Sequence, residues 1–253
     1  MKFLRGLLAA AVVASPWNSL RAEENRYDVV SKLLTPFIGV LAKTTKSPNR
    51  ALRLTGRLER LTGVPAELAG ATAEVALQFP NRLRVHGPLL GETVTICRDR
   101  QQVWATPGAR VQALLDLATA QKKLGKIDAA ARLEPLHLPL PDQQLVFLPA
   151  LLVVKDAGTE AVDGEPCRVL DLALLPELEK SLKENGWSAR VWVRADYRPA
   201  RLVLRRTGWE LAVKFDRVEF SPRLPDETWT PPAEDVLMLD GPRFRQLLQA
   251  IGG

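Results

Sequence analysis

Histidine and cysteine, on which most metal sites and many nucleophilic enzymes depend, are scarce in this sequence. The 253 residues include two histidines, His86 and His137, and two cysteines, Cys97 and Cys167. Neither histidine stands in a His-x-x-x-His spacing, and the cysteines do not form a Cys-x-x-Cys pair, so we expect no metal site and no cofactor. The sequence also lacks a Gly-x-Ser-x-Gly nucleophile elbow and a phosphate-binding glycine loop. With no motif for an enzyme mechanism, we expect a protein that is not an enzyme.

Pairs of carboxylates are a remaining route to acid–base catalysis, as in glycosidases. The acidic candidates are Glu59, Glu74, Asp163, Glu165, Asp216 and Glu219. Most of them alternate with apolar neighbours, which places them on the solvated face of a strand. A hydrolase therefore stands last among the functional alternatives.

Long apolar runs are also missing after the first residues of the chain. Lys2 and Arg5 precede a short apolar run from Leu7 to Ala14, and a small residue, Ala22, follows. This order is typical of a secretory signal peptide cleaved after Ala22, with a retained amphipathic anchor as the alternative. The run is shorter than the roughly 20 residues that a membrane span needs. We therefore expect residues 1–22 to be a signal peptide and residues 23–253 to form a single periplasmic domain.

The excess of basic over acidic residues is small once the signal peptide is removed. Residues 1–22 contain Lys2, Arg5 and Arg21 and no acidic side chain, so cleavage leaves 32 basic against 29 acidic residues. This balance is ordinary for a surface that must stay dissolved. We expect no nucleic-acid partner, and peripheral or no contact with a membrane.

The two cysteines both remain after cleavage. In an oxidising compartment an even pair can form one disulfide, so Cys97 and Cys167 are candidates for a bridge. Both stand in strand-like stretches, and two buried free thiols are the alternative.

Hydrophobic periodicity dominates the rest of the chain. Apolar residues recur at three- and four-residue steps from Asn25 to Thr45, which predicts an amphipathic helix. Period-two segments joined by tight turns predict an antiparallel meander. These segments are Ala51–Leu61, Ala71–Phe79, Arg82–His86, Thr93–Cys97 and Gln102–Thr106.

The middle of the chain is an apolar insert. Ala109–Leu124 has a helical pattern, and Leu136–Val154 is rich in leucine and proline, which restricts helices to short pieces. We expect a helical lid within about residues 109–154.

A second meander is expected from about Thr159. Asp163-Gly164 is a hairpin signal, and a short helix follows from Pro176 to Glu184. In the strand that begins at Trp209, the apolar parity slips before Val218, which predicts a β-bulge. A last helical segment covers Pro242–Ile251.

These elements predict an α+β fold: a strongly curved antiparallel half-barrel whose concave face is covered by helices. Two outcomes follow for the covered face. The helices fill the core, or they leave an apolar cavity whose cost, roughly 24 cal/mol per Å³, a ligand recovers.

Several local motifs occur in an order that resembles one known superfamily. The segments are Phe79-Pro80-Asn81-Arg82-Leu83-Arg84, Asp99-Arg100-Gln101-Gln102-Val103-Trp104 with Pro107, Trp192-Val193 with Pro199-Ala200-Arg201-Leu202, and Phe215-Asp216-Arg217-Val218 followed by the Pro-rich stretch from Leu224 to Pro232. In this order they resemble the periplasmic lipoprotein-carrier superfamily, which is LolA/LolB-like and includes outer-membrane lipoprotein-sorting relatives. The chain departs from that pattern at Arg100, where a glycine is usual, and at Ala105, where an aromatic residue often stands. The superfamily's lid-locking arginine has two counterparts here, Arg53 and Arg57, and no motif chooses between them.

The resemblance implies lipid binding without covalent chemistry. It implies an apolar cavity for the acyl chains of a lipid or lipoprotein, transport across the envelope, and an envelope protein as donor or acceptor. An envelope-protein sensing or scaffolding module of the same fold is the alternative. From strand and helix parity, the candidate cavity residues are Leu33, Phe37, Leu41, Val75, Leu77, Phe79, Leu83, Val85, Val94, Ile96, Val191, Val193, Leu202, Leu204, Leu211 and Val213.

Overall fold

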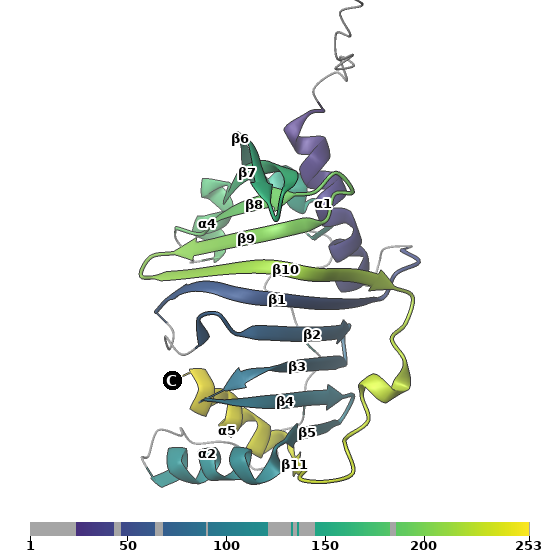
Figure 1. Ribbon diagram of the computed structural model, residues 1–253, viewed down its shortest axis with the longest axis vertical. Coiled ribbons are helices and arrows are strands. Elements are labelled where there is room, and N and C mark those ends of the chain that lie inside the picture. The colour runs from purple at the N-terminus through teal and green to yellow at the C-terminus, as the bar shows by residue number, and fades with distance from the viewer. Residues whose placement is uncertain are drawn as a thin grey trace, which may run out of the picture.

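The computed structural model describes residues 24–42, 47–63, 68–89, 91–120, 133, 136, 145–182 and 186–252. Within these ranges the chain forms one open antiparallel sheet of 11 strands, in the order β11-β5-β4-β3-β2-β1-β10-β9-β8-β7-β6 (Figure 1). The sheet does not close, because β11 and β6 are its two edges. The α+β half-barrel class that the sequence predicts is confirmed.

The elements have the following bounds. The strands are β1 (Ala51–Thr62), β2 (Thr72–Gln78), β3 (Arg82–Leu89), β4 (Glu92–Asp99), β5 (Gln102–Thr106), β6 (Leu152–Val162), β7 (Glu165–Leu174), β8 (Ser188–Val193), β9 (Pro199–Arg206), β10 (Trp209–Ser221) and β11 (Leu237–Leu239). The helices are α1 (Arg26–Leu41), α2 (Gly108–Ala120), α4 (Pro176–Leu182) and α5 (Gly241–Gly252), with 3-10 turns η2 (Leu148–Leu151) and η3 (Asp226–Thr228).

Two meanders share the sheet. Strands β1 to β5 form one half and β6 to β10 the other, and the long strands β1 and β10 pair in the middle. The chain leaves β5 for α2 and re-enters the sheet at β6, which is the opposite edge. The described part of the insert therefore begins at one end of the sheet and ends at the other.

The N-terminal helix follows the sequence closely. Asn25 caps α1, since its side chain accepts a hydrogen bond from the Tyr27 backbone NH at 3.1 Å. One stripe of the helix, including Val29, Val30 and Leu33, is buried. No helix in the described part of the chain is long and apolar enough to cross a bilayer.

A hairpin turn and a β-bulge that the sequence predicts are both confirmed. Asp163 and Gly164 join β6 to β7 with φ of 53° and 82°, the positive values that a tight hairpin turn of this type requires. The pairing of β1 with β10 shifts register between Thr55 and Gly56, opposite Asp216. This β-bulge keeps the apolar residues on both sides of the shift on one face of the sheet.

One boundary and one element differ from the sequence predictions. Strand β6 begins at Leu152 rather than near Thr159, so the end of the expected 109–154 insert is already sheet. The edge strand β11 was not predicted, because its three residues are too few to show an alternation. Helix α2 is described as far as Ala120, and the rest of the expected Ala109–Leu124 helix lies outside the described residues.

Apolar clusters fill the two ends of the concave face, the face that carries the helices. The α1 cluster packs α1 on β6 to β9, and its buried members are Val29, Val30, Leu33, Val154, Leu170, Val191 and Val193. The α2–α5 cluster packs α2 and α5 on β4, β5 and β11, and its buried members are Val94, Val103, Ala105, Val111, Leu115, Leu133, Leu239 and Leu247. Figure 1 shows α1 beside one half of the sheet and α2 with α5 at the opposite end.

Candidate functional site: an apolar trough between the helices

The middle of the concave face lies between the two clusters. Part of it is filled by a third cluster, in which Val40 of α1 packs with Leu52 and Val218 on β1 and β10. Strand register places Leu54, Val75, Val85 and Ile96 side by side on this face, across β1 to β4. Val85 is 39% exposed, although it stands on a central strand. Among the described residues, a set of partly or fully exposed apolar side chains belongs to no buried cluster. We call this set the central patch, and it consists of Leu58, Val75, Leu83, Val85, Leu204, Leu211 and Val213.

A row of small residues crosses the central patch. Gly56 pairs with Ala73, Ala73 lies beside Gly87, and Gly87 pairs with Val94. A Cβ atom on Gly56 would lie 2.9 Å from Cγ1 of Val213, and one on Gly87 would lie 3.3 Å from Cβ of Ala73. We call Gly56, Ala73 and Gly87 the trough. These three small residues stand between the valines and leucines of the central patch, and the Val213 side chain packs over Gly56, which is buried.

The trough leads to a pocket beneath α2. This apolar pocket has a volume of about 140 Å³ and is lined by Leu89, Val94, Arg110, Val111, Ala113, Leu114 and Leu117. Val94 belongs both to the pocket wall and to the row that begins at Gly56. Leu117, on the pocket rim, is 53% exposed. Val94, which is 4% exposed, therefore stands between the trough and the pocket.

The structure separates the sixteen candidate cavity residues into groups. Leu33, Phe37, Leu77, Val94, Ile96, Val191, Val193 and Leu202 pack into or against the buried clusters. Val75, Leu83, Val85, Leu204, Leu211 and Val213 belong to the central patch. Leu41 is partly buried at the end of α1, and Phe79 lies beyond the end of β2, in the turn before β3. The sequence interpretation omitted the trough, because it selected large apolar residues, and it also omitted Leu58.

Arg53 and Arg57, the two counterparts of the superfamily's lid-locking arginine, both lie on the convex face. Arg53 pairs with Ala76 and donates from Nη2 to Oγ1 of Thr228 at 3.3 Å, on the convex face. Arg57 has the same parity and is exposed. Neither can reach a lid on the concave face. Arg98 is the arginine that β4 directs to the concave face, as the alternation of Val94 and Ile96 already indicates.

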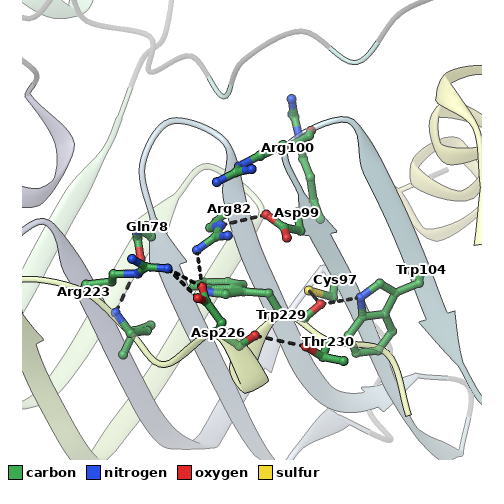
Figure 2. A network of polar contacts seen from close by, with 12 residues as sticks. Gln78, Arg82, Cys97, Asp99, Arg100, Trp104, Arg223, Asp226, Trp229 and Thr230 are labelled. Atoms are coloured by element: carbon green, nitrogen blue, oxygen red, sulfur yellow. Dashed lines mark hydrogen bonds and ion pairs between the residues drawn. The ribbon is translucent and has the colours of Figure 1, made fainter. Parts of the chain in front are cut away.

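Segment 222–236, which we call the strap, covers the convex face on the β1 to β5 half of the sheet. Trp229 of the strap is buried against β4 and β5, and its carbonyl oxygen accepts a hydrogen bond from Nε1 of Trp104 at 2.8 Å (Figure 2). Arg82 donates to Asp99 at 2.7 Å and to Asp226 at 3.2 Å, and its guanidinium lies 5.5 Å from the Trp229 ring centre. The hydrogen bonds from Arg223 lower the pKa of Asp226.

A polar pocket opens beside this network. Its volume is about 390 Å³, and Gln78, Phe79, Pro80, Asn81, Arg82, Arg100 and Arg223 line it (Figure 2). Arg100 has a φ of 57°, a left-handed backbone conformation that favours glycine. In the described part of the chain the Arg100 side chain has neither a hydrogen-bond nor an ion-pair partner, which leaves it available to an anionic group.

The expected disulfide is not formed. Cys97 and Cys167 are free, buried thiols. Cys97 packs with the strap on β4, whereas Cys167 packs on β7, seven strands away along the sheet. Disulfide formation needs Cα atoms within about 7 Å. The bridge prediction was therefore wrong, and the alternative of two buried thiols is correct.

Within the described ranges, five of the six acidic candidates, all except Asp216, are held in ion pairs with basic side chains. Glu59 pairs with Arg201 at 2.6 Å, Glu165 with Arg194 at 3.3 Å, and Glu219 with Arg217 at 2.7 Å. Glu74 and Asp163 also have basic partners, Arg84 and Lys214. Nδ1 of His86 lies 2.8 Å from Oγ1 of Thr95. No group of three histidine, cysteine, aspartate or glutamate residues within the described ranges could hold a metal ion.

No family model matches the chain, and no curated protein matches it. Solved structures do match. A chain of the Pseudomonas aeruginosa MucA/MucB complex is 14% identical with a TM-score of 0.44, and the match covers 85% of this chain and 63% of that one. This chain thus spans less than two thirds of that relative. The Mycobacterium tuberculosis lipoprotein LppX is 11% identical with a TM-score of 0.43, covering 79% of this chain and 96% of LppX.

A LolA superfamily protein from Nitrosomonas europaea also matches, with 12% identity and a TM-score of 0.29, over 79% of this chain and 96% of that one. The superfamily that the sequence motifs resemble is therefore present among the structural matches.

Proposed function

We propose that this chain is an exported periplasmic protein that holds acyl chains of a lipid or lipoprotein on its concave face and carries them across the envelope. It performs no covalent chemistry in this role. The central patch carries the proposal, since apolar side chains stay accessible there, between two ends that helices cover. Exposed apolar surface of this kind on a dissolved protein usually marks a binding site.

The row of residues that contains the trough is long enough for one acyl chain. From Val213 on β10 to Val94 on β4 there are four strand spacings, or about 19 Å at 4.8 Å per spacing. A bilayer core is about 30 Å thick and holds two leaflets, so one acyl chain extends over about 15 Å. A single chain therefore fits along this row, which ends beside the pocket under α2.

Burial of the ligand's hydrocarbon chain supplies enough free energy for binding. Burial of a methylene contributes about 0.8 kcal/mol, so eight methylenes contribute roughly 6 kcal/mol before entropic losses. The protein gains as well, because the ligand removes Val85 and its neighbours from water.

Export is part of the proposal. Residues 1–22 carry the signal-peptide pattern and lie outside the described residues, and α1 begins at Arg26. Amino-terminal sequencing of protein from the periplasm should begin at Glu23. Protein that starts at Met1 in the cytoplasm would contradict this part.

A pair of substitutions on β2 tests the binding site. Ala73→Leu fills the trough and should lower the uptake of a fluorescent fatty acid at least tenfold. Thr72→Leu is the control. It places a leucine at the neighbouring position, whose side chain is exposed on the other face of β2, and it should leave uptake unchanged. Equal uptake by folded Ala73→Leu protein and wild type would remove the trough from the binding site.

A second candidate is a module that binds an envelope protein without carrying lipid. The free Arg100 and the polar pocket on the convex side favour it. In that case Ala73→Leu has no effect on binding, and purified protein contains no lipid.

A further inference from the structure

Arg98 is a cation built into the apolar side of the sheet. Strand register places its Cα between those of Leu83 on β3 and Val103 on β5, in a row that otherwise carries apolar side chains. The residue is 4% exposed. Its neighbours of the same parity on β4 are Ile96 and Val94, both packed in or against the α2–α5 cluster.

The guanidinium group of Arg98 is incompletely paired. Its Nε donates to the backbone carbonyl oxygen of Arg100 at 3.1 Å. Its Nη2 is buried and has no acceptor, and no carboxylate within the described ranges forms an ion pair with Arg98. Burial lowers the pKa of Arg98, but arginine remains protonated in proteins. An unpaired buried charge is strongly unfavourable, so this position is suited to an anion.

Other arginines near the concave face do not have this property. Arg110, on the rim of the pocket beneath α2, forms an ion pair with Glu92 at 3.3 Å. Arg53 and Arg57 belong to the convex face. Among the described residues, Arg98 is thus the cation that adjoins the central patch through Leu83 and has a buried donor, Nη2, without an acceptor.

We propose that Arg98 binds the carboxylate of a fatty acid whose hydrocarbon chain lies on the central patch. The inference rests on the proposed function and narrows the cargo to single-chain lipids with a free acid group. A planar guanidinium matches a carboxylate through paired hydrogen bonds. Arg98 and Val94 lie about 13 Å apart along β4. One fatty acid can therefore place its carboxylate at Arg98 and extend its hydrocarbon chain to the trough.

The test compares two ligands of equal chain length. Binding of hexadecanoic acid and of its methyl ester is measured by displacement of a fluorescent fatty acid analogue from the mature protein. The wild type should prefer the acid by about 10- to 100-fold, the range expected for hydrogen bonds to a charged group. Equal affinity for acid and ester in the wild type overturns the inference and leaves the proposed function intact. Binding of neither ligand overturns the proposed function itself.

Arg98→Met tests the residue. The variant should bind the ester as the wild type does and lose the preference for the acid. The ligand-free variant should unfold at the same or a higher urea concentration, since an unpaired charge has been removed. Arg98→Lys keeps the charge without the planar fork and should show an intermediate preference. An undiminished preference in either folded variant overturns the role of Arg98.

Discussion

At the scale of single residues, the concave face is shaped by side chains that are small. Gly56, Ala73 and Gly87 form a row across three central strands, while valines and leucines stand on either side. Gly56 also allows β10 to approach closely, since a Cβ there would lie 2.9 Å from the carbonyl oxygen of Lys214. One residue thus serves both the sheet packing and the trough.

The thiols give a prediction at this scale. Burial raises the pKa of Cys97 to about 12 and also raises the pKa of Cys167. Thiolates are the reactive form, so neither cysteine should react with a thiol reagent in the folded protein. Two thiols per chain should react in denaturant without any reductant. A value of zero in denaturant would show that a disulfide exists.

The pair Asp171–Arg190 gives a pH-dependent prediction. Two hydrogen bonds from Arg190, at 2.7 and 2.8 Å, lower the pKa of Asp171 below its usual value of 3.8. A lowered folded-state pKa adds stability above the unfolded-state pKa, and this contribution is lost as the pH falls through the folded-state value. The pair is partly exposed, so its contribution is under about 1 kcal/mol.

Urea unfolding at several pH values tests the Asp171 prediction. Asp171→Asn should be less stable than the wild type at pH 6, and the difference should shrink towards pH 3. A difference that stays constant with pH would show that Asp171 is not ionised in the way described.

At the scale of elements, most of the fold follows from periodicity. The apolar alternation in β2 to β5 and the apolar stripe of α1 extend over enough residues to distinguish a strand from a helix. The parity slip before Val218 located the bulge. Strand β11 and the start of β6 were missed because they depend on pairing with distant strands rather than on local pattern.

The candidate site was predicted in part, for the same reason. Parity alone assigned Val85 and Val191 to one face, and both are there. Parity does not say which parts of that face a helix covers, so it could not separate the central patch from the filled ends. Arg98 was overlooked although the alternation of Val94 and Ile96 includes it, because a charged residue was not expected to face the core.

A matched pair of truncations tests this division of the face. Val191 is 3% exposed and packs in the α1 cluster, so Val191→Ala should cost about 2 kcal/mol of unfolding free energy. Val85→Ala, in the central patch, should change it by no more than about 0.5 kcal/mol. Both values come from urea unfolding of ligand-free protein. Equal large losses would mean that Val85 is ordinary core.

At the scale of the whole molecule, the open sheet divides its work between two faces. On the β1 to β5 half, the convex face is covered by the strap, which Trp229 and Asp226 hold in place, and this face carries paired charges. The concave face is filled at both ends and where α1 packs on β1 and β10, while the side chains of the central patch stay accessible. This arrangement combines a rigid frame with an apolar surface for a ligand.

The central claim is that the middle of the concave face holds a hydrocarbon chain. Native mass spectrometry of the mature protein, purified from the periplasm without detergent, measures this directly. We expect an added mass in the range of a lipid, which is lost on denaturation and is reduced in Ala73→Leu but not in Thr72→Leu. Protein that carries no added mass in repeated preparations, and takes none up from added fatty acid, would contradict the account.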